Sequence, residues 1–313
     1  MGEYGADAVR RTLADEGLAP LPSRRTVGRI LERRGALDAR RRVRRPAPPP
    51  GWYLPEVARG QAELDAFDLV EGLALKGGPA FDVLTGLSLH GGLAYAAVLS
   101  PAARARAIAG GLEAHWREAG LPGFAQFDNA AVFQGPHGKK HPDVLSRVVR
   151  LCASLQVTPV FVPPREPGFQ AALENFNGQW QAKVWQRFVF EDLAALEAQS
   201  ARYVAAKRAR AAPRVEAAPA RRAFPARWRL DLQVFPAGCV YFVRRTGDGG
   251  HVRLLERTFL VDPHWTHRLV RCEVDLDRDE LRCYALRRRA PEDQPLLARL
   301  PYRLLRRKKP FHE

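Results

Sequence analysis

The alternation of apolar and polar positions predicts a run of strands in the middle of the chain. Three apolar stretches, over residues 64–75, 81–89 and 93–99, are separated by turns that contain glycine or proline. Strands joined by such short turns usually pair as antiparallel neighbours. This part of the chain therefore predicts a three-stranded antiparallel unit.

After these strands the apolar period lengthens from two residues to between three and four, which predicts helices. Helical patterns cover 101–118, 143–155 and much of 169–208, and two short apolar strands, 124–127 and 158–162, lie between them. Three antiparallel strands, then helix, strand, helix, strand and further helices, are the element order of an RNase H-like fold, although mixed α/β patterns of this kind fit several folds and the placement of the acids is needed to narrow the choice. We therefore expect a mixed five-stranded sheet with helices over residues 58–210.

The N-terminal flank carries the pattern of two short helices around a proline-containing turn. Gly17 is placed to end the first helix, 5–16, and Ser23 is placed to cap the second, 24–34. Together they resemble part of a helix-turn-helix DNA-binding segment, which we assign to residues 1–38. A plain helical hairpin is the alternative. The arginines expected to face DNA are Arg24, Arg25 and Arg29.

Two segments rich in proline and arginine interrupt the regular patterns. We predict a basic linker over residues 39–57 and a second linker over 211–226. Beyond the second linker, several short strand patterns predict a small all-β barrel over residues 227–313, with a basic tail at its end. We expect this barrel to bind DNA, and a β-module that contacts other proteins is the alternative.

The distribution of charge gives these flanks a possible role. The 313 residues carry a formal charge of +16, yet residues 52–200 hold 12 Lys and Arg against 15 Asp and Glu. The centre is therefore at −3, and the flanks together carry +19. An acidic centre between basic arms is typical of a metal-binding or catalytic middle whose ends bind a polyanion. Arginine-rich tails that only aid solubility are the alternative.

Cysteine usage and apolar runs argue against several other classes of protein. The four cysteines are scattered, with no Cys-x-x-Cys pair, which argues against a zinc module and against a disulfide scaffold. The sequence contains no run of about 18 apolar residues, so no membrane span is predicted. The first residues show no secretory signal pattern. We therefore expect a cytoplasmic protein with no membrane partner.

Two acidic residues lie where a rigid element would present them to one site. Asp128 directly follows the apolar strand 124–127, and Glu174 lies near the start of a predicted helix. Gln170 and Asn177 share the helix face of Glu174 because they lie four residues before it and three after it. For these acids, a strand-ending turn and an exposed helical glutamate are the alternative interpretations.

The first predicted strand offers two further acids, Asp65 and Asp68. Because they are three residues apart on a strand, they face opposite sides of the sheet, and at most one can lie beside Asp128. Asp68 shares its face with Leu64 and Val70, an apolar setting where an unpaired acid costs free energy. We favour Asp68 and keep Asp65 as the alternative.

Carboxylates that converge from separate rigid elements suit the chemistry of phosphodiesters. That chemistry needs a nucleophile aimed in line and charge neutralised on the entering and leaving oxygens, and two Mg²⁺ ions supply both. Mg²⁺ and Mn²⁺ prefer hard oxygen ligands such as carboxylates. We therefore expect Asp68, Asp128 and Glu174 to bind two divalent ions.

The same residues carry a resemblance to a known family. The chain has Asp68 in a first strand, Asp128 and Asn129 at a strand end, and Gln170, Glu174 and Asn177 on a helix. This arrangement resembles the catalytic core of retroviral-type integrases and insertion-sequence transposases. The segments 87–92, 125–129, 132–135 and 163–170 look most similar to bacterial integrase-core transposases. The resemblance is strongest over residues 60–187.

This resemblance implies a D-D-E transposase or integrase, which cuts a DNA strand and joins the freed 3′-hydroxyl to target DNA. In that family an Asp, an Asp and a Glu bind the metal ions, which gives the catalytic and metal-binding roles to Asp68, Asp128 and Glu174. It also implies a homo-oligomer assembled on DNA, in a bacterial, nucleoid-associated protein. The residues that would contact DNA near the site are Asn129, Gln170 and Asn177.

One departure from the family concerns the loop after Asp128. Forty-five residues separate Asp128 from Glu174, more than is usual, and we place the extra length in residues 134–141. Lys139 and Lys140 on this loop are expected to contact DNA, with an ordinary surface loop as the alternative. Two other functions stay open: a non-catalytic DNA-binding protein derived from a transposase, and an RNase H-like nuclease that only hydrolyses.

Overall fold

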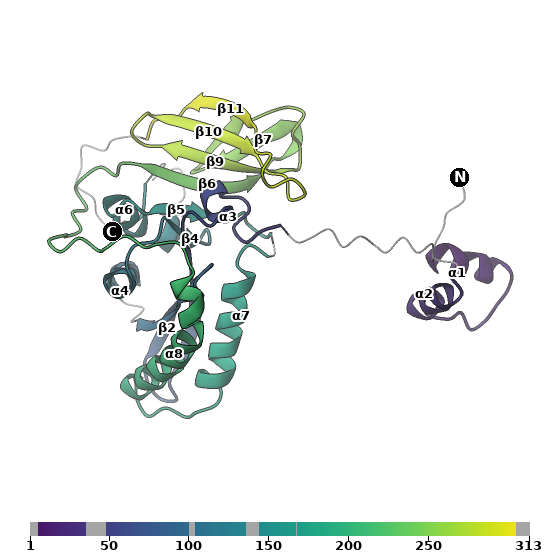
Figure 1. Cartoon of the computed structure of the whole chain (residues 1–313), viewed down its shortest axis with the longest axis horizontal. Helices are drawn as coiled ribbons and strands as arrows, with labels where there is room; N and C mark the ends of the chain where they lie inside the picture. Colours follow the sequence, from purple (N-terminus) through teal and green to yellow (C-terminus); the bar gives the residue numbers. More distant parts are fainter. Residues whose placement is uncertain (1–5, 36–47, 100–103, 136–143, 167, 305–313) are drawn as a thin grey trace. The chain divides into compact units, whose positions relative to one another are not determined.

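The computed structural model describes residues 6–35, 48–99, 104–135, 144–166 and 168–304. The chain divides into two compact units, residues 1–47 and 48–313 (Figure 1). Several features predicted from the sequence lie outside the described residues. They are residues 39–47 of the first linker, the loop residues Lys139 and Lys140, and residues 305–313 of the basic tail.

The smaller unit holds the two predicted helices, α1 (Ala6–Asp15) and α2 (Arg24–Arg33). Gly17 has a left-handed φ of 82° beyond α1, and the Ser23 hydroxyl accepts the Thr26 N–H at 3.1 Å as the N-cap of α2. The helices are thus confirmed, and their binding to DNA stays a prediction. The arginines expected to face DNA are exposed on α2: Arg24, Arg25 and Arg29.

The larger unit is built on one mixed sheet, in which the described residues contribute nine strands in the order β11-β10-β9-β6-β5-β4-β1-β2-β3 (Figure 1). The pairs β1–β2 and β2–β3 are antiparallel, whereas β1–β4, β4–β5 and β5–β6 are parallel. The five strands expected for the core are therefore present as β3-β2-β1-β4-β5. The strand bounds are β1 Leu64–Ala74, β2 Ala80–Ser88, β3 Ala94–Leu99, β4 Phe124–Phe127, β5 Thr158–Phe161, β6 Cys239–Arg245, β9 Leu269–Asp275, β10 Glu280–Ala285 and β11 Leu296–Pro301.

Helices cover both faces of this sheet. The helices α4 (Arg104–Ala119) and α6 (Arg147–Ser154) pack against a buried cluster that contains Leu84 of β2. The π-helical turn η2 and α8 pack against a separate cluster that contains Val83. Because neighbouring residues of a strand face opposite sides, the two helix sets lie on opposite faces. Their further bounds are α7 Ala171–Trp180, η2 Gln181–Trp185 and α8 Leu193–Glu216.

The remaining elements are short. They are the helices α3 (Pro55–Ala58) and α5 (Ala131–Gln134), the 3₁₀ turn η3 (Asp248–Gly250), and a separate hairpin of β7 (His251–Leu254) and β8 (Arg257–Leu260). Among the helices described here, none combines the length and the apolar character that a membrane crossing requires.

The C-terminal strands differ from the separate barrel that the sequence predicted. β6 pairs in parallel with β5, with Phe161 opposite Phe242, and the sheet continues through β9, β10 and β11. The two rings stack with centroids 5.2 Å apart and are fully buried. Alternation along a strand does not specify its partner, so the sequence pattern left this pairing open. In the fold, β6 covers what would be an open edge of β5.

Both predicted linkers also differ from the structure at their ends. Residues 52–54 and α3 pack in a buried apolar cluster, so the first linker ends before them. α8 continues to Glu216, which makes the start of the second linker helical. Beyond it, Arg222 forms an antiparallel bridge with Leu121. Burial of apolar side chains and main-chain pairing therefore hold segments whose composition alone suggested spacers.

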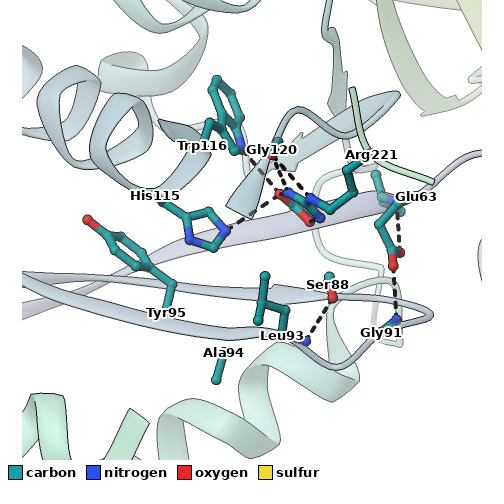
Figure 2. A network of polar contacts seen from close by, with 12 residues as sticks. Glu63, Ser88, Gly91, Leu93, Ala94, Tyr95, His115, Trp116, Gly120 and Arg221 are labelled. Carbon is teal, nitrogen blue, oxygen red and sulfur yellow. Dashed lines mark hydrogen bonds and ion pairs between the residues drawn. The ribbon is translucent and has the colours of Figure 1, made fainter. Parts of the chain in front are cut away.

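A buried polar network fastens the segment after α8 to β1 (Figure 2). Asp65 is 1% exposed, and its carboxylate accepts hydrogen bonds from Arg221 at 2.6 and 2.9 Å and from Trp116 Nε1 at 3.1 Å. Figure 2 shows Arg221, Trp116 and His115 pointing toward one another, and His115 Nε2 lies 3.7 Å from the Asp65 carboxylate.

This network sets the ionisation of Asp65. Burial alone would raise the pKa of its carboxyl, but the hydrogen bonds and charges of Arg221 and His115 outweigh burial and hold the pKa of Asp65 well below its usual value. Asp65, the alternative first acid of the sequence analysis, is therefore occupied by an ion pair on the α4 face of the sheet.

Candidate active site

Asp68 and Asp128 are level with each other on neighbouring strands. β1 and β4 pair in parallel with Ala66 opposite Gln126, and the same register continued by two residues sets Asp68 opposite Asp128. Neighbouring strands are about 4.8 Å apart. The two acids therefore lie side by side at the carboxyl edge of the parallel strands, which is where open α/β sheets usually bind ligands.

Asp68 is half-buried, and a side chain of α7 orients it. The Asn177 amide donates from Nδ2 to the Asp68 carboxylate at 2.9 Å, and the Leu69 N–H is a further donor. Asn177 is 8% exposed, and its Oδ1 has no hydrogen-bond partner among the described residues. One amide thus holds the carboxylate and leaves a buried oxygen unsatisfied. The predicted DNA contact of Asn177 stays a prediction.

The acids around Asp68 change its ionisation. Burial first, and then the negative charges of Asp128, Glu174 and Glu71, raise the pKa of Asp68 to about 6, against the opposing hydrogen bond from the Leu69 N–H. Burial and the charge of Glu71 likewise raise the pKa of Asp128. The carboxyls therefore lie near enough to repel one another.

Asp128 sits in a braced turn directly after β4. Its Oδ1 accepts the Ala130 N–H at 3.0 Å, which is the strand-ending turn considered as an alternative. Asn129 donates from Nδ2 to the Val162 carbonyl at 2.7 Å, and its Oδ1 accepts from Arg244 Nη2 at 2.7 Å. The loop that carries Asp128 is therefore tied to the ends of β5 and β6.

Arg244 is a supporting residue that the sequence did not single out. It is 8% exposed, and its Nη1 donates to the carbonyls of Val162 at 3.3 Å and Val243 at 2.9 Å, while its guanidinium lies 5.0 Å from the Phe242 ring centre. Burial lowers the pKa of Arg244 to about 10, so it stays charged at neutral pH. Its strand pattern held no signal for this role, because only the pairing of β5 with β6 brings it to Asn129.

Glu174 affects the ionisation of Asp68 through its charge. It lies in the first turn of α7, is exposed, and contributes to the raised pKa of Asp68. Gln170 precedes the helix and makes a long contact, 3.5 Å from its Nε2 to the Phe67 carbonyl. In the described part of the chain, no three His, Cys, Asp or Glu side chains form a group that could hold a metal ion. The three predicted ligands are therefore not gathered around one point.

The chemistry of the donors nevertheless fits a hard divalent cation. The ion pairs of the described residues include neither Asp68 nor Asp128, although both are partly buried. Close carboxylates without a basic partner repel each other, and a bound cation relieves that repulsion. Carboxylate and amide oxygens are also the ligands that Mg²⁺ and Mn²⁺ prefer. These two acids are thus the main candidates for holding such an ion, with Glu174 the third.

Glu71 is a fourth acid near the site that sequence reasoning missed. Glu71 comes three residues after Asp68, so a regular strand would place the two side chains on opposite faces. β1 also carries a bulge between Val70 and Leu73, which inserts one extra residue there, and the charge of Glu71 raises the pKa of both Asp68 and Asp128. Glu71 also pairs with an arginine at the start of α4 at 2.7 Å. No local sequence signal marked this bulge apart from the glycine that follows Glu71.

Comparison with known proteins gives structural similarities only. No family model matches the chain, and no curated protein matches it either. The catalytic core domain of BIV integrase aligns with 46% of this chain and 81% of its own, at 19% identity and a TM-score of 0.33. A simian T-cell lymphotropic virus intasome, solved in complex with PP2A regulatory subunit B56 gamma, aligns with 61% of this chain at 14% identity and a TM-score of 0.37.

The second alignment spans 63% of the intasome chain, which is less than two thirds of it. With TM-scores below 0.5, both alignments are similarities and nothing more. The strand order and the side-chain contacts of this chain are therefore the basis for its functional assignment.

Proposed function

We propose that this protein is a D-D-E-type transposase or integrase that cuts and joins DNA strands with divalent metal ions. The observation that carries the proposal is the parallel pairing of β1 with β4 up to Ala66 and Gln126, two residues before Asp68 and Asp128, together with the charge of Asp128 that raises the pKa of Asp68. A buried acid with a purely structural role is usually paired with a base, as Asp65 is with Arg221. Unpaired acids at the carboxyl edge of parallel strands instead favour a cation-dependent active site.

Asp68, Asp128 and Glu174 are the residues that would hold two Mg²⁺ or Mn²⁺ ions. When bound, such ions polarise the scissile phosphate and lower the pKa of the attacking water. Around them, Asn177 orients the Asp68 carboxylate, and Asn129 and Arg244 fix the loop that carries Asp128. Asp68 within β1 and Asp128 at the end of β4 would hold the ions in fixed positions, so that the ions could stabilise the charge that develops on the phosphate.

The proposed reaction consists of two in-line displacements at phosphorus. In the first, water attacks a phosphodiester and the 3′-oxygen leaves, taking up a proton to become a hydroxyl. In the second, that hydroxyl attacks a phosphodiester of target DNA and displaces another 3′-oxygen, so that one P–O bond forms as one breaks. Because a protonated carboxyl is a poor metal ligand, we expect activity to rise as the pH passes about 6, the pKa of Asp68.

The remaining parts of the chain supply the proposed DNA contacts. The basic α2, with Arg24, Arg25 and Arg29 exposed, would bind element-end DNA, and Gln170 would contact DNA near the scissile phosphate. Lys139 and Lys140 keep their predicted role on the loop outside the described residues. Assembly of a homo-oligomer on DNA is part of the same proposal.

The test is a strand-transfer assay with Mg²⁺ or Mn²⁺ on labelled oligonucleotides that carry the DNA bounding the gene. We expect Asp128→Asn and Glu174→Gln to abolish cleavage and joining, while Glu113→Gln, on an exposed ion pair of α4, retains both. Retained activity in Asp128→Asn would refute the assignment of the site. Cleavage without joining would instead identify a nuclease, and salt-sensitive DNA binding without cleavage would identify a non-catalytic DNA-binding protein.

A further inference from the structure

A cavity of about 640 Å³ shares no lining residue with the proposed active site. Its walls come from distant parts of the chain: Trp52 before α3, Glu166 after β5, Trp265 with residues 267–269 at the start of β9, and residues 286–290 after β10. Arg245, the last residue of β6, completes the wall. We call this cavity the arginine–tryptophan pocket.

The charge of the arginine–tryptophan pocket is strongly positive. Five arginines line it and Glu166 is its one acid, so the lining carries +4 with histidine neutral. Glu166 pairs with Arg245. Arg268, Arg288 and Arg289 are exposed, and none of the three pairs with an acid among the described residues. The pocket therefore attracts an anion.

Aromatic rings hold these arginines in place. The Arg268 guanidinium lies 4.7 Å from the ring centre of Trp265, and the Arg288 guanidinium lies 5.9 Å from that of Trp52. The two tryptophans are only 8% and 6% exposed, so the arginines form the outer layer of the wall. A guanidinium stacked on a ring keeps its N–H edge free for bidentate bonds to phosphate. Its outer face is free to stack on a nucleobase.

The size of the pocket limits what can enter it. A volume of 640 Å³ lies within the range of about 300–1,000 Å³ that is typical of small-ligand sites. A single nucleotide fits such a space, whereas a DNA double helix does not. Positive charge combined with planar stacking surfaces is the usual composition of sites for unpaired nucleotides.

β6 connects the arginine–tryptophan pocket to the proposed active site. Arg244 and Arg245 are neighbours on this strand and point to its opposite faces: Arg244 donates to Asn129 beside Asp128, and Arg245 pairs with Glu166 in the pocket. The pocket and the loop that carries Asp128 are therefore both fastened to the end of β6.

We propose that the arginine–tryptophan pocket binds an unpaired nucleotide at or near the end of the DNA on which the protein acts. The choice of DNA as the ligand rests on the function proposed above. The choice of the binding site rests on the pocket itself. The arginines would bind the phosphate by their N–H edges, and the base would stack on a guanidinium face. The pocket would thus favour DNA whose ends are frayed or single-stranded.

The experiment compares the dissociation constants of one labelled duplex with and without a short adenine overhang, by fluorescence anisotropy in EDTA. We expect the wild-type protein to prefer the overhang by on the order of tenfold, the effect of stacking one base. Arg268→Ala/Arg288→Ala should lose that preference. The matched control Arg227→Ala/Arg229→Ala removes the same charge from exposed positions outside the pocket and should weaken both duplexes equally.

Two further variants keep the outcome interpretable. Arg268→Lys/Arg288→Lys retains the charge but lacks the planar fork, so it should bind the blunt duplex normally and lose the preference. An unchanged preference in either pocket variant would overturn the proposal. Asp128→Asn should keep the preference, because the pocket does not involve the acids. If wild-type protein shows the preference but neither cuts nor joins DNA, the pocket stands and the proposed function fails.

Discussion

Two aspartates of β1, only three residues apart, have opposite surroundings. Asp65 faces α4, where Arg221, Trp116 and His115 surround it, and its pKa is lowered. Asp68 faces α7, where other acids surround it, and its pKa is raised to about 6. Breaking the pair of a buried ionised acid is costly, whereas partly buried acids without a basic partner repel one another, which is the setting that the proposed cation site requires. The partners of the two aspartates, and not their shared strand, determine how their pKa values differ.

The largest expected effect is on the structural side of this comparison. Asp65→Asn leaves the Arg221 guanidinium, whose side chain is 13% exposed, without its partner. Loss of one member of a buried ion pair costs about 3–5 kcal/mol. Urea unfolding should show a loss of this size for Asp65→Asn and little loss for Asp68→Asn. Arg221→Met in the Asp65→Asn background should recover part of it, and independent, additive effects would contradict the pairing.

The two aspartates should also differ in the sign of their pH dependence. The fold lowers the pKa of Asp65, so its contribution to stability is present above the ordinary value of 3.8 and is lost as the pH falls below it. The fold raises the pKa of Asp68 to about 6, so its contribution is full below 3.8 and is lost as the pH rises to about 6.

Unfolding free energies of the two Asp→Asn variants, measured against pH, test these signs. The deficit of Asp65→Asn relative to wild type should shrink on acidification. Asp68→Asn should gain stability relative to wild type as the pH rises from 3.8 to about 6, because the wild type then acquires a repelled charge. Slopes of the same sign in both variants would contradict the comparison.

A third prediction concerns the brace behind Asp128. Arg244→Lys removes the planar fork that binds Asn129 and two carbonyls. Loss of a residue that orients metal ligands typically lowers metal affinity or activity by about 10–100-fold. The metal concentration for half-maximal strand cleavage should therefore rise, while a control change at exposed Arg229 leaves it unaltered. A stability loss without any change in metal dependence would show Arg244 to be purely structural.

The smallest expected effect comes from Glu71, which adds to the repulsion around Asp68. Glu71→Gln should lower the pKa of Asp68, and by less than Asp128→Asn does, because Glu71 contributes less. Carbon NMR titration of the Asp68 carboxyl measures both shifts. A pKa that does not respond to Asp128→Asn would show that the two acids are not neighbours.

The parts of this fold that were predictable from the sequence are those set by local pattern. Periodicity located the core strands and helices, and alternation alone placed Asp65 and Asp68 on opposite faces. The identity of the partner strand was not predictable, because β6 carries the same alternation whether it closes a barrel or extends a sheet.

The local sequence pattern also could not predict which distant residues contact the aspartates and their supporting loop. Arg221 lies in a segment with the composition of a linker, and Arg244 looks like any other arginine of a strand. Each acquires its role only when distant elements meet: Arg221 at Asp65, and Arg244 at Asn129. The bulge beside Glu71 is likewise a property of strand pairing.

The most direct test asks whether Asp68 is the cation-binding acid of β1. Mn²⁺ is titrated calorimetrically into the wild-type protein and into its Asp65→Asn and Asp68→Asn variants. We predict that the wild type binds Mn²⁺, that its affinity falls about tenfold for each pH unit below 6, and that folded Asp65→Asn binds similarly. Asp68→Asn should lose this binding. Wild-type affinity for Mn²⁺ in Asp68→Asn would contradict the account.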